Sequence, residues 1–137
     1  MKIKIEEKYH NFKIKNVEEV VDFFQSIFQK EDKVDQDKEH FFVLHLDGRN
    51  KIKFCELVSL GTLNSAPVSP REVFTRAVRE RTASIIVCHN HPTNEVEPSN
   101  SDLEINKRLK RAGKILDIPL LDSIIIANDG SDYWNVR

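Results

Sequence analysis

The pattern of hydrophobic and polar positions predicts a helix near the start of the chain. Apolar residues recur at helical spacing between residues 17 and 28, with polar and charged residues at the positions between them. Asn16 precedes this stretch and Glu19 follows three residues later, which is the pattern of a helix-capping pair. Residues 31–38 are highly charged and have no apolar period, so we expect a solvated helix end and a connection there.

Strand patterns follow this helix. Residues 40–46 and 51–59 flank Asp47-Gly48-Arg49-Asn50, and together they predict a hairpin of two adjacent strands. Residues 83–88 form a short, uncharged stretch rich in β-branched side chains. This pattern is typical of a strand that is buried on both faces.

Helix and strand signals alternate through the second half of the chain. Ser69 and Pro70 predict a helix start, and Ser99 predicts a second helix that ends near Gly113 as its C-cap. Residues 120–127 predict a further strand. Because helices are interleaved with strands, we predict a layered α/β fold in which helices flank a mixed sheet.

Composition narrows the class of protein. The chain has 137 residues, 39% of them hydrophobic, which suits one globular domain over residues 1–137. Lys and Arg number 21 against 22 acidic residues, so no overall electrostatic field attracts nucleic acid or a membrane. No apolar run approaches the roughly 20 residues of a membrane helix and no signal-peptide core is present, so we expect a cytoplasmic protein. Cys55 and Cys88 match no disulfide or zinc pattern, and we expect reduced thiols.

The strongest chemical signal lies just after the apolar stretch 83–88. In an extended chain His89 and His91 project to the same side, so both can bind one ion while Asn90 points away. The loop that follows can return toward these imidazoles, and Asp102 can then supply a third ligand. Two imidazoles and one carboxylate, with a fourth position for water, are a ligand set expected of catalytic zinc rather than of a closed structural site.

The same residues carry a family resemblance. His89-x-His91, a gap of seven residues and Ser99-x-x-Asp102 together resemble the metal motif of the JAMM (MPN+) metalloproteases. Four further sequences, in order, resemble the bacterial RadC-like branch: Gly61-Thr62-Leu63-Asn64, Pro70-Arg71-Glu72-Val73-Phe74, His89-Asn90-His91-Pro92 and Leu120-Leu121-Asp122. The resemblance extends from about Glu39 to Ala127. It implies the cytidine-deaminase-like α/β architecture of JAMM/MPN domains. We expect a single such domain, without the helix-hairpin-helix region that often precedes it.

The resemblance also implies a chemistry. His89, His91 and Asp102 fall on the family's metal ligands, for one Zn²⁺ per chain, and Ser99 falls on the serine that steadies an oxyanion. Glu39, at the start of the first core strand, matches the catalytic glutamate. The implied activity is hydrolysis of peptide or isopeptide bonds in a peptide or protein substrate, with a metal-activated water as the nucleophile.

Other interpretations use some of the same residues. Ser99-x-x-Asp102 is also a capping-box pattern, in which both side chains satisfy free backbone groups at a helix start. Glu56 competes with Glu39 for the role of base, although an acid on an apolar strand face needs a partner if that face is buried. Cys88 adjoins His89, but strand alternation turns it to the opposite side as a buried structural thiol.

Two other functional classes share part of this pattern. Zinc deaminases also combine a metal with a glutamate, but the chain lacks their His-x-Glu and Pro-Cys-x-x-Cys sequences. The second class is a DNA-repair-associated accessory module that keeps the metal and has little or no catalysis. Such a module would bind nucleic acid, which the net charge of -1 does not favour.

Overall fold

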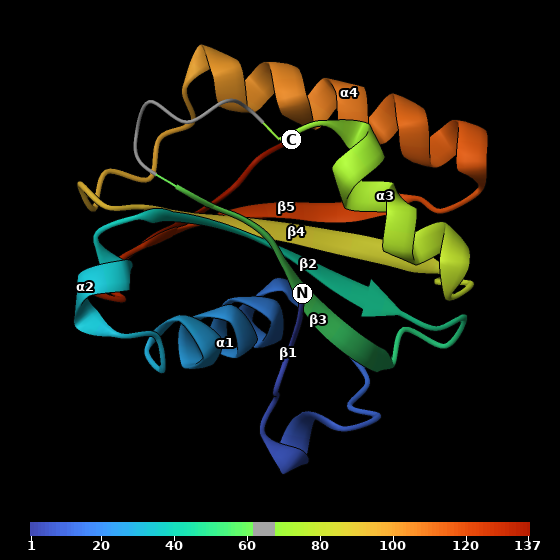
Figure 1. The fold of residues 1–137 in the computed structure, drawn as a ribbon, viewed down its shortest axis with the longest axis horizontal. Coiled ribbons are helices and arrows are strands. Elements are labelled where there is room, and N and C mark those ends of the chain that lie inside the picture. Colours follow the sequence, from blue (N-terminus) through green and yellow to red (C-terminus); the bar gives the residue numbers. More distant parts are fainter. Residues whose placement is uncertain (62–67) are drawn as a thin grey trace.

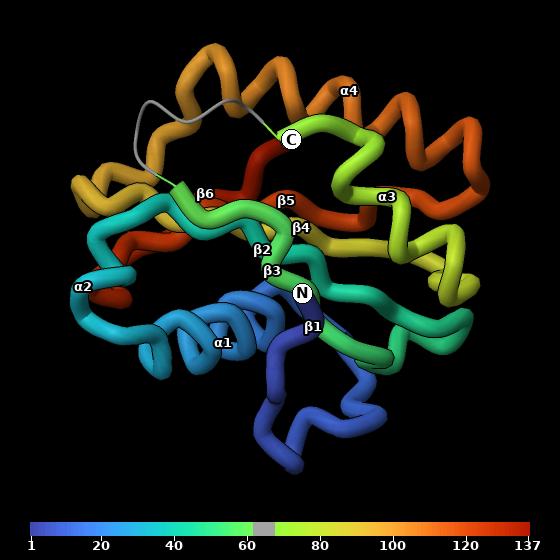
Figure 2. Tube along the Cα trace, in the orientation of Figure 1, coloured from blue at the N-terminus to red at the C-terminus, as the bar shows by residue number. Residues whose placement is uncertain are grey.

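The structure is a computed structural model, and it describes residues 1–61 and 68–137. The sequence Thr62-Leu63-Asn64 lies outside the described residues. The sheet has six strands in the order β1-β3-β2-β4-β5-β6, with β1 and β6 at its edges (Figure 2). Their bounds are β1 (Lys2–Ile3), β2 (Glu39–Leu46), β3 (Ile52–Gly61), β4 (Ser84–His91), β5 (Leu120–Ala127) and β6 (Tyr133–Asn135). The β4–β5 pair is parallel and the other pairs are antiparallel, so the sheet is mixed.

Helices cover both faces of this sheet (Figure 1). On one face lie α1 (Val17–Phe28) and the short α2 (Lys33–Gln36), and on the other lie α3 (Pro70–Arg79) and α4 (Asn100–Leu116). A 3-10 turn, η1 (Glu7–Tyr9), precedes α1. The predicted layered α/β fold with flanking helices is therefore confirmed, and its mixed sheet is consistent with a JAB/MPN domain.

Strand alternation divides most of the core into two large apolar clusters, one on each face of the sheet. Phe42 and Cys88 pack with the side chains of α1, whereas Phe41 packs with those of α3 and α4. The ring of His89 stacks on Phe41, with centroids 5.9 Å apart, so it lies on the α3 and α4 side. Neighbouring residues of β4 thus serve opposite faces of the sheet, as the period of a strand requires.

The predicted helix starts are confirmed by their caps. The side chain of Asn16 accepts a hydrogen bond from Glu19 N, and Ser69 accepts one from Glu72 N. Ser99 begins α4 with a complete capping box, in which Ser99 Oγ accepts from Asp102 N and Asp102 Oδ2 accepts from Ser99 N. Each cap satisfies backbone N–H groups that have no partner inside the helix.

The predicted C-cap at Gly113 is wrong. Helix α4 continues to Leu116 and ends at Asp117, which adopts the left-handed conformation with φ 59°. Gly113 lies inside this helix, and a Cβ there would be 2.5 Å from the carbonyl oxygen of Ile118. The chain returning toward β5 passes so close to the helix that only a residue without a side chain fits.

One strand end and some short elements also differ from the pattern-based expectations. Strand β4 runs to His91 rather than residue 88, because its last residues pair with β5 as far as Ala127. The charged stretch 31–38 contains α2, and β6 is a short edge strand that no pattern predicted.

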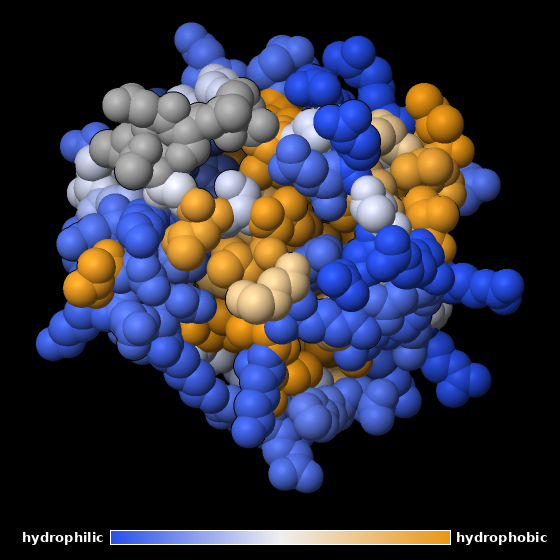
Figure 3. Space-filling view, in the orientation of Figure 1, coloured by the Kyte–Doolittle hydropathy of each residue, from blue (hydrophilic) through white to orange (hydrophobic). Residues whose placement is uncertain are grey.

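The β1 and β3 edge of the sheet carries exposed apolar side chains (Figure 3). Strand β1 pairs with β3 at two positions, Lys2 with Glu56 and Ile3 with Cys55, so backbone pairing covers this edge only in part. Within the described residues, no helix is long and apolar enough to cross a membrane.

Candidate metal site

Three side chains converge where β4 ends and α4 begins. Nε2 of His89 lies 3.2 Å from Nε2 of His91 and 3.2 Å from Oδ1 of Asp102. Nε2 of His91 lies 3.0 Å from Oδ2 of Asp102. The three side chains are between 7% and 15% exposed, so the donors are sheltered but reachable from solvent.

This spacing suits a small tetrahedral cation. Zinc ligands lie about 2.0–2.2 Å from the ion, which places neighbouring donors of a tetrahedron about 3.3 Å apart. The three separations fall within a few tenths of an ångström of that edge. Two imidazole nitrogens and a carboxylate are also donor types that zinc accepts. The donor set therefore fits the metal that the sequence pattern implies.

Neighbouring groups hold the ligand side chains in place. Nδ1 of His91 lies 2.6 Å from the carbonyl oxygen of Glu95, which can only accept, so Nδ1–H donates there and Nε2 is the nitrogen that faces Asp102 and His89. The capping box holds Asp102, while stacking on Phe41 orients the ring of His89. Nδ1 of His89 is buried and has no hydrogen-bond partner among the described residues.

The electrostatics favour an ionised carboxylate at the site. Burial raises the pKa of Asp102, but hydrogen bonds with His89 and His91 outweigh burial and hold that pKa well below its usual range. For His91 the directions are reversed. Burial lowers its pKa, but hydrogen bonds to Asp102 and to the Glu95 carbonyl outweigh burial and raise that pKa. Asp102 can therefore offer a negative charge to a cation at neutral pH.

Glu39 brings a second carboxylate to the same place. It is the first residue of β2, where it pairs with Gly61 of β3, and its side chain is half-buried. One carboxylate oxygen of Glu39 and one ring nitrogen each of His89 and His91 lie within 4.8 Å of one another. Glu39 and Asp102 therefore each lie close to both histidines, and Ser99 contacts Asp102 through the capping box.

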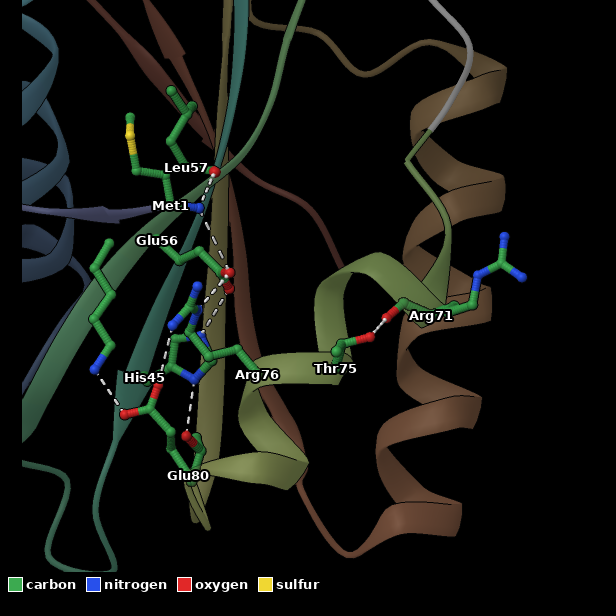
Figure 4. Close-up of polar contacts among 10 residues, drawn as sticks. Met1, His45, Glu56, Leu57, Arg71, Thr75, Arg76 and Glu80 are labelled. Atoms are coloured by element: carbon green, nitrogen blue, oxygen red, sulfur yellow. Dashed lines mark hydrogen bonds and ion pairs between the residues drawn. The ribbon is translucent and has the colours of Figure 1, made fainter.

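Glu56, the competing acid, belongs to a different cluster (Figure 4). Its Oε2 accepts a hydrogen bond from Nε of Arg76 at 2.9 Å, and the amino group of Met1 lies 3.8 Å from the same oxygen. Nε2 of His45 lies 3.4 Å from its other oxygen. The expected partner of this buried acid is present, and Glu56 is not part of the cluster that could hold a metal.

The buried His45 is expected to make folding sensitive to acid. Its Nδ1 accepts from the Thr82 hydroxyl at 2.8 Å, and its Nε2–H points to Glu56. Burial lowers the pKa of His45 from 6.5 to about 4, and the attraction of Glu56 offsets this only in part. Above pH 6.5 the folded and unfolded states both carry neutral imidazole. As the pH falls from 6.5 toward 4, the unfolded chain gains the proton first, and the free energy of unfolding declines.

The predicted loss is about 2 kcal/mol at pH 5 relative to pH 7. Denaturant unfolding of the parent chain and of His45→Gln, measured from pH 7 to pH 4.5, isolates this contribution, because glutamine does not titrate. The two curves should converge as the pH falls. Curves that run parallel would show that His45 is not the group responsible.

Both cysteines are structural, as expected. Cys55 and Cys88 are free thiols and both are fully buried. Burial raises the pKa of each thiol, so neither is a reactive thiolate at neutral pH.

A groove of about 610 Å³ opens beside His91. One wall is the loop after β4, which includes Glu95 and Glu97, and the other wall includes Trp134 of β6. Val96 anchors the loop by packing into a small apolar cluster with side chains of β5. Among the candidate ligands, the groove therefore gives access to His91.

Asn90 is a residue of the site region for which the sequence patterns predicted no role. It is completely buried between the two histidines, and its amide bonds with Lys38 O, His40 N and Asn128 Oδ1. The signal was available in principle, because an amide inside a buried strand must find partners. The identity of those partners depends on which segments lie beside β4.

Comparison with known proteins agrees with the fold and with the site motif. The family model of a RadC-like JAB domain matches residues 14–135. A UPF0758 protein of Pelodictyon phaeoclathratiforme is 52% identical over 96 residues, which are 70% of this chain and 43% of that protein. A UPF0758 protein of Chlorobaculum parvum is 41% identical over 127 residues, which are 93% of this chain and 54% of that protein.

The chain spans about half the length of the curated relatives it matches. The family match covers nearly all of the chain, including every residue gathered at the candidate metal site. The resemblance that the sequence motifs suggested is confirmed. The chain belongs to the RadC-like JAB-domain family.

Proposed function

We propose that this chain is a zinc-dependent hydrolase of peptide or isopeptide bonds. The observation that carries the proposal is the convergence of His89, His91 and Asp102 at separations of 3.0–3.2 Å, with the Glu39 carboxylate close to the two histidines. Three protein ligands and a nearby carboxylate are the arrangement of a catalytic zinc site, whereas a structural zinc site uses four protein ligands.

Asp102, rather than Glu39, is assigned as the third ligand. Asp102 makes close contacts with both imidazoles and is held by the capping box, so its carboxylate is fixed on the ligand side. Glu39 enters from β2 and makes no hydrogen bond to either histidine, which leaves its carboxylate available for a proton. Zinc at this position would lower the pKa of a bound water to about 7 and polarise a substrate carbonyl.

The remaining chemistry belongs to two side chains. Glu39 accepts the proton of the attacking water and delivers it to the leaving amine. Ser99 Oγ accepts from Asp102 N at 3.1 Å, which leaves its own O–H free to donate to the carbonyl oxygen as negative charge develops there. Ser99 can therefore cap α4 and stabilise the transition state together.

The groove beside His91 supports a chain-like substrate. It is open along the loop after β4 and reaches Trp134, so an extended peptide can lie in it with one bond near His91. The loop is held at two adjacent residues, by the His91 contact to Glu95 and by the bond from Asp129 N to Asn94 Oδ1. A groove that is already formed lowers the cost of ordering a substrate.

The direct test is zinc-dependent cleavage. The chain, purified without chelator and loaded with zinc, is incubated with a proteome-derived peptide mixture and with peptides joined through a lysine isopeptide bond. Mass spectrometry is expected to detect new termini that disappear with chelator and return with zinc. A chain that retains about one zinc but cleaves neither substrate would contradict the proposal. Salt-dependent DNA binding by that inactive chain would favour the accessory module instead.

A further inference from the structure

We infer that Asn90 is a positioning residue that sets the place of Glu39 relative to the metal ligands. The inference rests on the proposed function, because it concerns the residue assigned there as the base. It is carried by the hydrogen bonds of one fully buried amide between His89 and His91.

Asn90 holds the backbone on both sides of Glu39. Its Oδ1 accepts from His40 N at 2.6 Å, and its Nδ2 donates to the carbonyl oxygen of Lys38 at 3.0 Å. These two atoms belong to the two peptide units that flank the Cα atom of Glu39. Since peptide units are planar, holding both of them leaves little freedom in the direction of the Glu39 side chain.

A second amide holds Asn90 itself. The remaining Nδ2 proton of Asn90 goes to Oδ1 of Asn128 at 2.7 Å, and Nδ2 of Asn128 donates to the carbonyl oxygen of Gln36 at 2.6 Å. Both protons and the oxygen of the Asn90 amide are therefore used, which leaves one orientation of this side chain. The network links β4, the residue after β5 and the turn from α2 into β2.

Strand geometry explains why this position holds the amide. His89 and His91 point to the ligand side of β4, so Asn90 points to the opposite face, toward the turn that precedes β2. Three consecutive residues thus supply two ligands and the support for the base. Because Asn90 is completely buried, removal of its side chain leaves His40 N and Lys38 O without their protein partner.

A double-mutant cycle tests the positioning role. Asn90→Ala should keep about one zinc per chain and lower kcat about 10- to 100-fold, with a smaller change in KM, since small displacements of a reacting group cost rate in this range. In the Glu39→Gln background, Asn90→Ala should leave kcat almost unchanged, because its effect on kcat acts through Glu39. Equal losses in both backgrounds would overturn the inference.

Two further variants guard against a general folding defect. Asn128→Ala removes one support of Asn90 at a half-exposed position and should lower kcat about 3- to 10-fold, with the same dependence on Glu39. Asn106→Ala is the matched control, because Asn106 is also a buried asparagine, 4% exposed, but forms no hydrogen bond with the residues around Glu39. It should leave zinc content and kcat unchanged. A loss in Asn106→Ala as large as in Asn90→Ala would contradict a specific role.

Hydrogen exchange supplies a test that does not need activity. In Asn90→Ala the amide proton of His40 should exchange at least about tenfold faster, while that of Val43 in the same strand changes little. Equally faster amide exchange at His40 and Val43 would show that Asn90 does not specifically hold the backbone around Glu39. If the parent chain is inactive but the exchange of the His40 amide still depends on Asn90, the proposed function is overturned. The Asn90 hydrogen bonds then have a structural role only.

Discussion

Replacing Glu39 by glutamine is expected to abolish most turnover while leaving the metal in place. Glutamine has the shape of glutamate, but its neutral amide cannot take a proton from water. General acid–base catalysis contributes about 10²–10⁴-fold, so kcat should fall by that factor. The metal should remain because His89, His91 and Asp102 make their close contacts without Glu39.

The measurement combines peptide-cleavage kinetics with elemental analysis of the same samples. Glu56→Gln is the matched control, since it makes the same chemical change in the cluster around Arg76 and His45. That control should lower the free energy of unfolding, because Glu56 is a buried acid that satisfies Arg76, while kcat of the folded protein stays near the parent value. Full turnover in Glu39→Gln would exclude Glu39 as the base.

Removal of a ligand side chain is expected to release the metal. Substitution of groups that only support ligands typically costs 10- to 100-fold in metal affinity, so loss of a ligand itself should exceed about 100-fold. His89→Ala and Asp102→Asn are the informative variants. Elemental analysis of protein purified without chelator should find about one zinc in the parent and little in either variant.

Controls separate metal loss from damage to the fold. His10→Ala changes an exposed histidine outside the site and should keep the metal. Ser99→Ala removes the cap and costs about 1 kcal/mol of stability, but it leaves all three ligands in place. Zinc should raise the unfolding temperature of the parent and of both controls, because a ligand that binds only the folded state stabilises it. Full zinc content in His89→Ala would show that the three-ligand site is incorrect.

The same short segment of β4 serves several parts of the proposed mechanism. His89 and His91 face Asp102, Asn90 faces the backbone around Glu39, and the loop after His91 forms a wall of the groove. This compactness explains why the site depends on the register between β2 and β4, in which Phe41 pairs with His89. A shift of one residue would turn both histidines to the α1 face.

Local physics explains what could be predicted from the sequence. Asn16, Ser69 and Ser99 cap their helices through bonds to residues three positions away, so the pattern and the contact lie in the same few residues. The common direction of His89 and His91 follows from strand alternation alone. The alternation of helices and strands likewise determines the layered α/β class, and the motif spacing identifies the family.

Tertiary structure decided the rest, because those features depend on contacts between distant residues. Gly113 looked like a helix end, but it lies inside α4, where the close approach of Ile118 requires a residue without a side chain, and the C-cap is Asp117. The place of Glu39 beside the histidines, and the Asn90 contacts that flank it, join positions about 50 residues apart. The sequence by itself determined the ligand types and their spacing, whereas the packing of β2 against β4 decided which acid reaches them and what holds it there.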